Sequence, residues 1–431
     1  MYINTNEMFL FRKFEYQNTF DSFVWVINNY DKINYEEIKK TVYACAGEAI
    51  EVAVRFGFRG NLWHNFLTYL LVNSENPFSM ALEIGGSVSG TIETLARRDF
   101  DIFKQLYDFD LSLIDRVLGL DCLTPILSFE NTDCSKAIIS KTITGALHEL
   151  SISLGKAEST QDFYTCMHRF YTQFGAGKYA LFKAFKVCLS GDKTEIHPIS
   201  KTEDLHLSDL VGYELQKKEL VKNTEDFING YKANNVLLFG DSGTGKSSSI
   251  KALLNEYSDR GLRMIEVYKH QFGSLQDIIQ QVRERNYKFI IYMDDLSFED
   301  FETEYKYLKA IIEGGLEAHP HNVLLYATSN RRHLIREKWS DKADRDDDLH
   351  TNDTVQEKLS LASRFGLSIL YISPSKKEFN NIVRVLAQRN NITLPEDELL
   401  LEAGRWEMRH GGLSGRTAHH FINYLKTIAS G

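Results

Sequence analysis

Residues Val236–Ser247 read VLLFGDSGTGKS, in which four apolar residues run directly into a glycine-rich loop. The last eight residues match G-x-x-x-x-G-K-[ST], with Gly240, Gly245, Lys246 and Ser247 at the fixed positions. A helical pattern follows at once, so the loop stands between a predicted strand and a predicted helix, as a phosphate-binding loop requires. The sequence therefore predicts a nucleoside triphosphate site here, and ATP is the expected ligand.

Each part of this loop has a predicted role. Backbone N–H groups of the tight loop are expected to face the phosphates, and Lys246 to neutralise the β and γ phosphates. The Ser247 hydroxyl is placed to bind Mg²⁺. A glycine-rich turn without a ligand is the alternative, and the agreement of the fixed positions with both flanking elements disfavours it. The predicted ATP-binding residues of the loop are Gly240, Asp241, Ser242, Gly243, Thr244, Gly245, Lys246, Ser247 and Ser248.

A second strand pattern ends in two acidic residues. Residues 289–293 read FIIYM and are followed by Asp294 and Asp295, the arrangement of a Walker B element. Carboxylates at the carboxyl end of a parallel strand face the ligand crevice, so Asp294 is predicted to hold Mg²⁺ and Asp295 to orient the attacking water. The alternative is that one aspartate caps the helix expected near Phe298.

Three further polar residues are candidates for catalysis. Asn330 follows the predicted strand Val323–Ala327 and could hydrogen-bond the water or the γ-phosphate, although an asparagine after a strand is commonly a turn residue. Arg364 precedes the last predicted strand, and Arg416 begins the final predicted helix. Such arginines stabilise charge on a transferring phosphoryl group. The alternative for each is a surface arginine that pairs with a carboxylate.

Length, composition and charge favour a protein of several packed units without a membrane segment, and they restrict how it could bind nucleic acid. The chain has 431 residues, 43% of them hydrophobic, which is enough for several packed units. A formal net charge of -9 means that nucleic acid could bind only at a local basic patch. No signal peptide and no apolar run of about 18 residues is found, so a cytoplasmic protein with no membrane segment is expected. Reduced thiols are expected for the five cysteines, Cys45, Cys122, Cys134, Cys166 and Cys188.

Periodicity predicts three regions. Apolar residues recur at helical spacing up to about Lys193, which predicts a helical N-terminal domain over residues 1–195. Five short apolar runs then alternate with helical stretches over residues 196–373, as expected for a parallel α/β sheet. Helical patterns alone follow over residues 374–431. The segment 192–209 is the expected linker or entry hairpin.

The order of these motifs resembles the AAA+ ATPase superfamily over about residues 199–428. Five longer sequence segments resemble one bacterial family that is known only as a P-loop domain of unknown function. These segments are VGYELQKKELVKNTEDF, DDLSFED, YATSNRRHLI, EKLSLASRFGL and SGRTA. The resemblance implies that Asn330 is the sensor 1 residue, Arg364 the arginine finger and Arg416 the sensor 2 arginine. It also implies that Val211 and Gly212 lie beside the adenine, and that the C-terminal helices form a lid over the nucleotide.

The predicted function is ATP hydrolysis with Mg²⁺ that drives remodelling or loading of a macromolecular partner. Asp295 stands where glutamate is commoner, and a shorter acid slows hydrolysis, so the alternative is a slow nucleotide-dependent switch or scaffold. A small-molecule kinase fits the sensors less well. A homo-oligomer is expected because an arginine finger acts on a neighbouring subunit. The N-terminal domain is the expected site for a protein client. Nucleic acid is a less favoured partner, for which the cationic run is Arg331, Arg332, His333 and Arg336.

Overall fold

The computed structural model describes residues 2–32, 35–130, 137–191, 193–298, 304–313, 320–330 and 361–429. Packing divides the chain into two compact units, Met1–Lys183 and Ala184–Gly431. Each unit has its own buried apolar cluster. None of the helices that the structure describes is long and apolar enough to cross a membrane.

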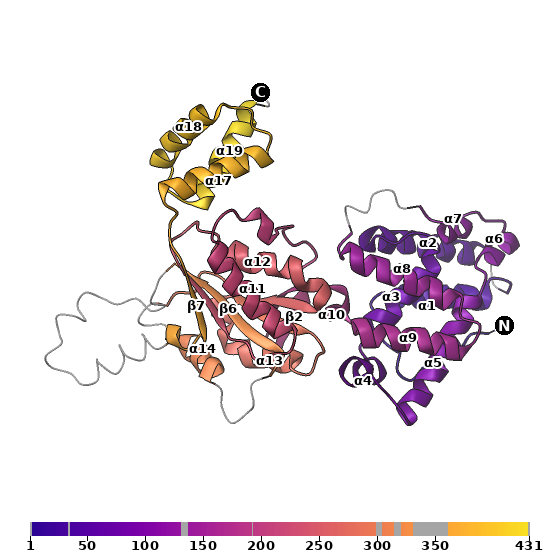
Figure 1. Ribbon diagram of the computed structural model, residues 1–431. Coiled ribbons are helices and arrows are strands. Elements are labelled where there is room, and N and C mark those ends of the chain that lie inside the picture. The colour runs from indigo at the N-terminus through magenta and orange to yellow at the C-terminus, as the bar shows by residue number, and fades with distance from the viewer. Residues whose placement is uncertain are drawn as a thin grey trace. The chain divides into compact units, whose positions relative to one another are not determined.

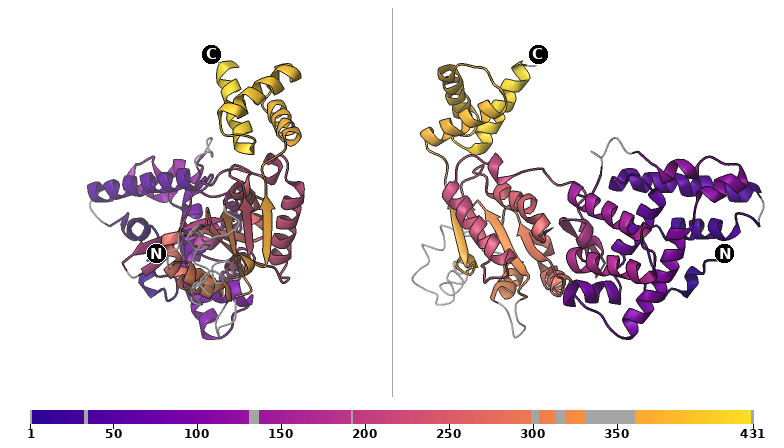
Figure 2. Two further views of the ribbon diagram at one scale, coloured as in Figure 1. Left: turned by 90° about the vertical axis from the view of Figure 1, so that its left-hand side faces the viewer. Right: turned by 45° about the vertical axis from the view of Figure 1, so that its right-hand side comes forward.

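The first unit is built from helices (Figures 1 and 2). Its core is rich in aromatic residues, among them Phe163, Phe170 and Tyr171, which are buried. The four cysteines of the described segments are free, and Cys134 lies outside them. The helices are α1 (Gln17–Asn29), α2 (Tyr35–Phe56), α3 (Leu62–Asn73), α4 (Pro77–Gly85), α5 (Thr91–Asp108), α6 (Ser112–Leu118), α7 (Leu123–Leu127), α8 (Lys141–Gly155), α9 (Thr160–Phe174) and α10 (Lys178–Leu181).

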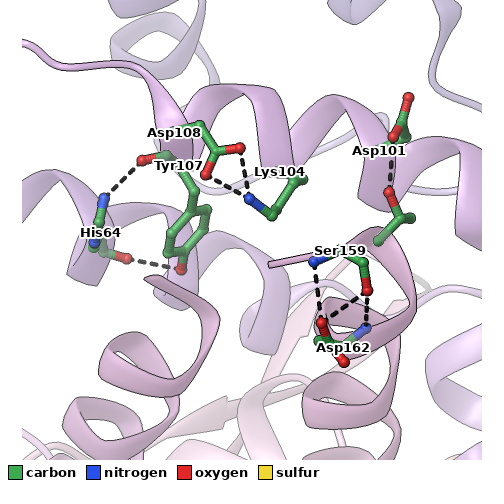
Figure 3. Close-up of polar contacts among 8 residues, drawn as sticks. His64, Asp101, Lys104, Tyr107, Asp108, Ser159 and Asp162 are labelled. Atoms are coloured by element: carbon green, nitrogen blue, oxygen red, sulfur yellow. Dashed lines mark hydrogen bonds and ion pairs between the residues drawn. The ribbon is translucent and has the colours of Figure 1, made fainter. Parts of the chain in front are cut away.

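Polar contacts tie the helices of this unit together (Figure 3). His64 Nε2 on α3 lies 2.9 Å from the backbone oxygen of Tyr107 on α5, and the Tyr107 hydroxyl donates to the His64 carbonyl at 3.1 Å. Thr160 at the start of α9 donates to Asp101 on α5 at 2.8 Å. These bonds satisfy polar groups between helices, so they have a structural role.

The second unit contains a seven-stranded sheet in the order β2-β1-β4-β5-β6-β3-β7 (Figure 1). Strands β1 and β2 pair antiparallel, and all the other pairs are parallel. The predicted phosphate-binding loop follows β3, which lies between β6 and β7. The strands are β1 (Ala184–Ser190), β2 (Lys193–Pro198), β3 (Val236–Gly240), β4 (Leu262–Glu266), β5 (Lys288–Met293), β6 (Val323–Ser329) and β7 (Leu367–Tyr371).

The five predicted strands are confirmed as β3 to β7, and their apolar runs are largely buried. Helices α11 (Glu214–Ile228) and α12 (Lys246–Tyr257) pack on one face of the sheet, where Leu220 and Ile250 meet Leu238 in one apolar cluster. Helices α13 (Leu275–Val282) and α14 (Glu304–Glu313) contact each other. The unit also has 3-10 turns at Leu207–Asp209, Ser258–Arg260 and Lys269–Ser274.

The hairpin β1–β2 corrects one prediction. Helical structure was expected up to about Lys193, but Ala184–Ser190 forms a strand that pairs with β4. Phe185 and Val187 are buried while Lys186 between them is exposed, which is the alternation of a strand. Seven residues directly after a helix are too short a run for that alternation to stand out. The sheet therefore begins at Ala184, before the boundary predicted at residues 195–196.

Three helices follow β7, namely α17 (Lys376–Arg389), α18 (Glu396–Arg409) and α19 (Gly415–Ala429). They match the predicted helical patterns and share a small core that contains Phe379, Leu399 and Phe421. The fold class is confirmed as an α/β fold with a mostly parallel sheet, a glycine-rich loop after β3 and a C-terminal group of helices, preceded by a helical region. The P-loop strand and the strand that ends in Asp294 are separated by β6 alone.

Candidate functional site

Most of the predicted site residues line one cavity of about 570 Å³ in the second unit. Its walls come from the predicted phosphate-binding loop, the carboxyl ends of β5 and β6, the chain before α11, and helices α17 and α19. Parallel strands bring their carboxyl ends to one edge, which is why residues far apart in sequence meet here. The lining residues are Leu210, Val211, Tyr213, Lys217, Ser242–Ser249, Asp294, Asp295, Thr328, Asn330, Ile382, Gly415, Arg416, His419 and His420.

Lys246 is the first residue of α12, directly after the loop, and it is buried. Its Nζ donates to the backbone oxygens of Gly240 and Asp241 at 3.0 and 2.6 Å, and to Asn330 Oδ1 at 3.0 Å. Burial lowers the pKa of Lys246, and the nearby carboxylates of Asp241 and Asp295 oppose that shift. A phosphate would offer this ammonium a charged acceptor in place of neutral ones, and charge-assisted bonds are the stronger kind.

Ser247 and Asp294 meet at the same edge. The Ser247 hydroxyl donates to Asp294 Oδ1 at 2.6 Å, and Thr328 Oγ1 donates to the same oxygen at 2.6 Å. Burial alone would raise the pKa of Asp294, but these hydrogen bonds outweigh burial and the pKa is lowered. The carboxyl group is therefore held as a carboxylate.

The donor set fits Mg²⁺. A serine hydroxyl and a carboxylate are hard oxygen ligands, which Mg²⁺ prefers. The described segments contain no group of three or more His, Cys, Asp or Glu side chains able to hold a metal ion by themselves. Mg²⁺ usually keeps several waters and binds through one or two protein oxygens together with substrate phosphates. Ser247 and Asp294 are the residues that would hold the ion.

Asp295 is linked to Lys246 through one side chain. Asn330 Nδ2 donates to Asp295 Oδ1 at 2.8 Å, while Asn330 Oδ1 accepts from Lys246. The backbone N–H of Asp295 donates to Thr328 Oγ1 at 2.9 Å. Asp295 has a φ of 49°, a left-handed conformation that is strained for a residue with a side chain. The fold therefore holds this carboxylate at the edge of the cavity against a local cost.

The two predicted arginines lie in different places. Arg416 lines the cavity, and its backbone N–H donates to the Gly243 carbonyl at 3.2 Å, so the start of α19 touches the loop. Arg364 is not among the lining residues and pairs with Glu313 of α14. Arg416 can thus approach a ligand in the cavity of its own chain, whereas the Arg364 side chain contacts the Glu313 carboxylate.

Three predicted nucleotide-binding residues do not line the cavity. Gly240 packs against β7, and Asp241 Oδ2 accepts from the backbone N–H of Ser373 at 2.7 Å. That bond is the main reason why the pKa of Asp241 is lowered. Gly212 is not a lining residue, although Val211 before it is one. Gly240 and Asp241 shape the loop and attach it to the chain that leads to α17.

Several residues of this cavity were not predicted from the sequence. Thr328 bonds both Asp294 and the Asp295 backbone, and its position two residues before Asn330 on a strand could have predicted a shared side. His419 and His420 follow Arg416 by three and four residues on α19, so they share its helix face. Burial is the main reason why the pKa of His419 is lowered. No comparable pattern indicated Leu210 or Tyr213.

The predicted cationic run, Arg331, Arg332, His333 and Arg336, lies outside the described residues. Nucleic-acid contact at that run stays a prediction.

The chain is similar to one protein family and to several solved structures. No curated protein has a significantly similar sequence. The RuvB Holliday junction branch migration motor of Thermotoga maritima is similar in structure with a TM-score of 0.36 and 16% sequence identity, and the match covers 52% of this chain and 64% of that chain. One mutant of the same protein has a TM-score of 0.35, with 15% identity and the same coverage. The chain thus spans less than two thirds of these structures. A family model matches residues 180–428, more than half of the 431 residues. The chain belongs to the family described as "Protein of unknown function (DUF815)".

Proposed function

We propose that this protein binds ATP with Mg²⁺ in the 570 Å³ cavity and hydrolyses it to drive remodelling or loading of a macromolecular partner. The observation that carries the proposal is the connected set of side chains at one sheet edge. Lys246, Asn330 and Asp295 form one chain of hydrogen bonds, and Ser247 bonds Asp294 beside it. A cation, a water-orienting acid and hard oxygen ligands are the parts that phosphoryl transfer to water needs.

Each residue has a role in this proposal. Backbone N–H groups at the start of α12 and the Lys246 ammonium bind the phosphates. Asp295 accepts a hydrogen bond from the attacking water and aligns it, and Asn330 holds both Asp295 and Lys246 in place. Mg²⁺, bound by Ser247 and Asp294, would supply positive charge for the phosphate oxygens. Arg416 adds a second cation from the lid, formed by α17 to α19.

A binding and turnover experiment tests this proposal. Lys246→Ala removes the buried ammonium, so it should abolish both the fluorescence change of a labelled ATP analogue and phosphate release. Lys222→Ala, an exposed lysine on α11, is the matched control and should behave as wild type. A wild-type protein that binds no nucleotide in the presence of Mg²⁺ would overturn the proposal.

The proposal extends to a homo-oligomer and a protein client. Arg364 lies outside the cavity of its own chain, which supports a role for it at the nucleotide of a neighbouring subunit. The helical N-terminal unit is proposed as the surface that meets the client. ATP-dependent movement of the lid against the sheet would change what that surface presents.

A slow nucleotide-dependent switch is the second candidate, and one observation favours it. The Asp295 carboxylate is short and already bonded to Asn330 at 2.8 Å, so its reach toward water is restricted. A steady-state phosphate-release rate separates the two candidates. Turnover well below about one per minute, unchanged by any added partner, favours the switch.

A further inference from the structure

Thr328 is a buried residue that connects the two acids of the candidate site. It is the residue before the end of β6 and is only 2% exposed. In the register of the sheet, Met293 at the end of β5 pairs with Ala327 of β6, so the residues that follow these two come side by side. Thr328 therefore stands next to the point where the chain leaves β5 for Asp294 and Asp295.

The two hydrogen bonds of the Thr328 hydroxyl fix its direction. The hydroxyl oxygen accepts from the backbone N–H of Asp295 at 2.9 Å, and the hydroxyl donates to Asp294 Oδ1 at 2.6 Å. A hydroxyl has one hydrogen to donate, and an ionised carboxylate can only accept. The hydrogen of Thr328 is therefore committed to the Asp294 carboxylate. One side chain thus joins the candidate Mg²⁺ ligand to the backbone of the water-orienting acid.

These bonds belong to a strained turn. Asp295 has a φ of 49°, and such conformations persist only where the surrounding structure constrains them strongly. The end of β6 supplies the constraint, because the Leu296 N–H donates to the Thr328 carbonyl at 2.7 Å and the Ser329 hydroxyl donates to the Leu296 carbonyl at 2.7 Å. The Thr328 hydroxyl is the acceptor for the N–H of the strained residue itself.

We propose that Thr328 is a positioning residue, whose hydroxyl holds the Mg²⁺ ligand and the water-orienting acid in one fixed relation. Without the hydroxyl, the Asp294 carboxylate loses a donor that orients it. The Asp295 backbone loses its acceptor, so the turn can relax and carry the Asp295 carboxylate out of line. Residues behind metal ligands orient those ligands, and their loss lowers metal affinity or activity roughly 10- to 100-fold. This inference rests on the proposed function.

A second buried threonine of the same unit separates this role from ordinary packing. Thr224 on α11 is 0% exposed, and its hydroxyl donates to the Leu220 carbonyl at 2.8 Å and lies 2.9 Å from the Tyr326 hydroxyl. Thr224 is not among the residues that line the 570 Å³ cavity. Valine has nearly the shape of threonine but no hydroxyl. Thr328→Val and Thr224→Val therefore remove the same group at two places, one beside the acids and one away from them.

The experiment compares these variants by the Mg²⁺ concentration that half-saturates binding of a fluorescent ATP analogue, by phosphate release at saturating Mg²⁺–ATP, and by urea unfolding of the free protein. Thr328→Val should need about tenfold more Mg²⁺ and release phosphate about tenfold or more slowly than wild type. Thr328→Ser keeps the hydroxyl and should restore both. Thr224→Val should lower the urea midpoint, because a buried hydrogen bond is lost, and leave the other two quantities at wild-type values.

Several results would contradict the inference. If Thr328→Val keeps either the Mg²⁺ requirement or the turnover of an active wild type, the hydroxyl does not hold the two acids together, and the proposed function stays intact. Equal losses in Thr224→Val would assign the effect to lowered stability, and losses that persist in Thr328→Ser would assign it to the methyl group. If Thr328→Val does not fold, Thr328→Ala compared with Thr328→Ser gives the same test. A wild type without nucleotide binding or phosphate release removes the proposed function itself, and this inference with it.

Discussion

At the scale of single residues, the site depends on side chains that each serve two partners. Asn330 accepts from Lys246 and donates to Asp295, so one amide sets the orientation of both a cation and an acid. Thr328 has the same kind of double role, since its hydroxyl donates to Asp294 and accepts from the Asp295 backbone. The amide and hydroxyl are uncharged, yet they determine where the charged groups point.

Replacing Asn330 tests this description. Asn330→Ala should lower steady-state phosphate release by about 100-fold or more, because Asp295 loses the donor that orients it. Binding of an ATP analogue should change only a few-fold, since the loop and Lys246 remain. Measuring both quantities on the same preparation checks the prediction. Loss of binding in proportion to turnover would show that Asn330 acts on the loop instead.

At the scale of secondary structure, the loop is held by the close approach of two strands. Gly240 ends β3 with a φ of 127°, and a Cβ atom built on it would lie 1.9 Å from the Tyr371 carbonyl oxygen of β7. Only glycine tolerates both the backbone conformation and the contact. The first glycine of the motif therefore serves strand packing, and the phosphates are left to the residues after it.

Gly240→Ala should destabilise the second unit by about 3 kcal/mol, from backbone strain and the forced separation of β3 and β7. Gly273→Ala is the control, because a Cβ there has open space and the change should cost well under about 1 kcal/mol. Urea midpoints with and without nucleotide measure the effect. Equal midpoints for the two variants would contradict the packing role of Gly240.

Packing between helices α3 and α5 should make the first unit sensitive to pH. His64 on α3 is bonded to the Tyr107 backbone of α5, and burial lowers the pKa of His64 below its unfolded value (Figure 3). The neutral form is favoured in the folded state, so stabilisation is complete above the unfolded pKa of about 6.5 and is lost as pH falls below it.

Hydrogen-exchange protection of α3 and α5 should therefore decrease between about pH 7 and pH 5. His64→Gln keeps an amide donor but does not titrate, so its protection should depend less on pH. His197→Gln, at an exposed position of the other unit, should leave the wild-type profile unchanged. A profile for His64→Gln identical to that of wild type would show that other groups set the pH dependence.

Some of these elements can be predicted from the sequence and others cannot, because their hydrophobic patterns differ in length and regularity. Strands β3 to β7 were predictable because each is a short apolar run between helical patterns, and β3 to β6 are buried along most of their length. Asp294 and Asn330 were predictable because they follow such runs directly. The hairpin β1–β2 was not, since a short alternating strand directly after a helix gives little periodicity. Residues such as Tyr213 enter the cavity through tertiary packing, which no local pattern encodes.

At the scale of the whole molecule, the lid and the sheet form one site while Arg364 lies apart. Arg416 reaches the loop through its backbone bond to Gly243, and Arg364 is held by Glu313. One arginine is therefore available to the nucleotide within a chain. The other has a catalytic role only if a second subunit brings its own cavity to Arg364.

Arg364→Ala should reduce phosphate release by about 100-fold or more at concentrations where the protein associates, and leave nucleotide binding intact. Glu313→Gln removes its carboxylate partner and keeps the arginine, so it should retain turnover. Rates measured over a range of protein concentrations, with sedimentation on the same samples, check this. Unchanged turnover of Arg364→Ala in the associated state would rule out the finger.

In the proposed reaction, Asp295 activates water for attack on a bound triphosphate, and the substitution Asp295→Asn tests this role. Asp295→Asn preserves the shape of the side chain and an oxygen for Asn330, but it removes the negative charge. Phosphate release from ATP is measured for both proteins at saturating Mg²⁺–ATP. The variant should bind ATP as tightly as wild type and release phosphate about 100-fold or more slowly. Equal rates of release from both proteins would contradict it.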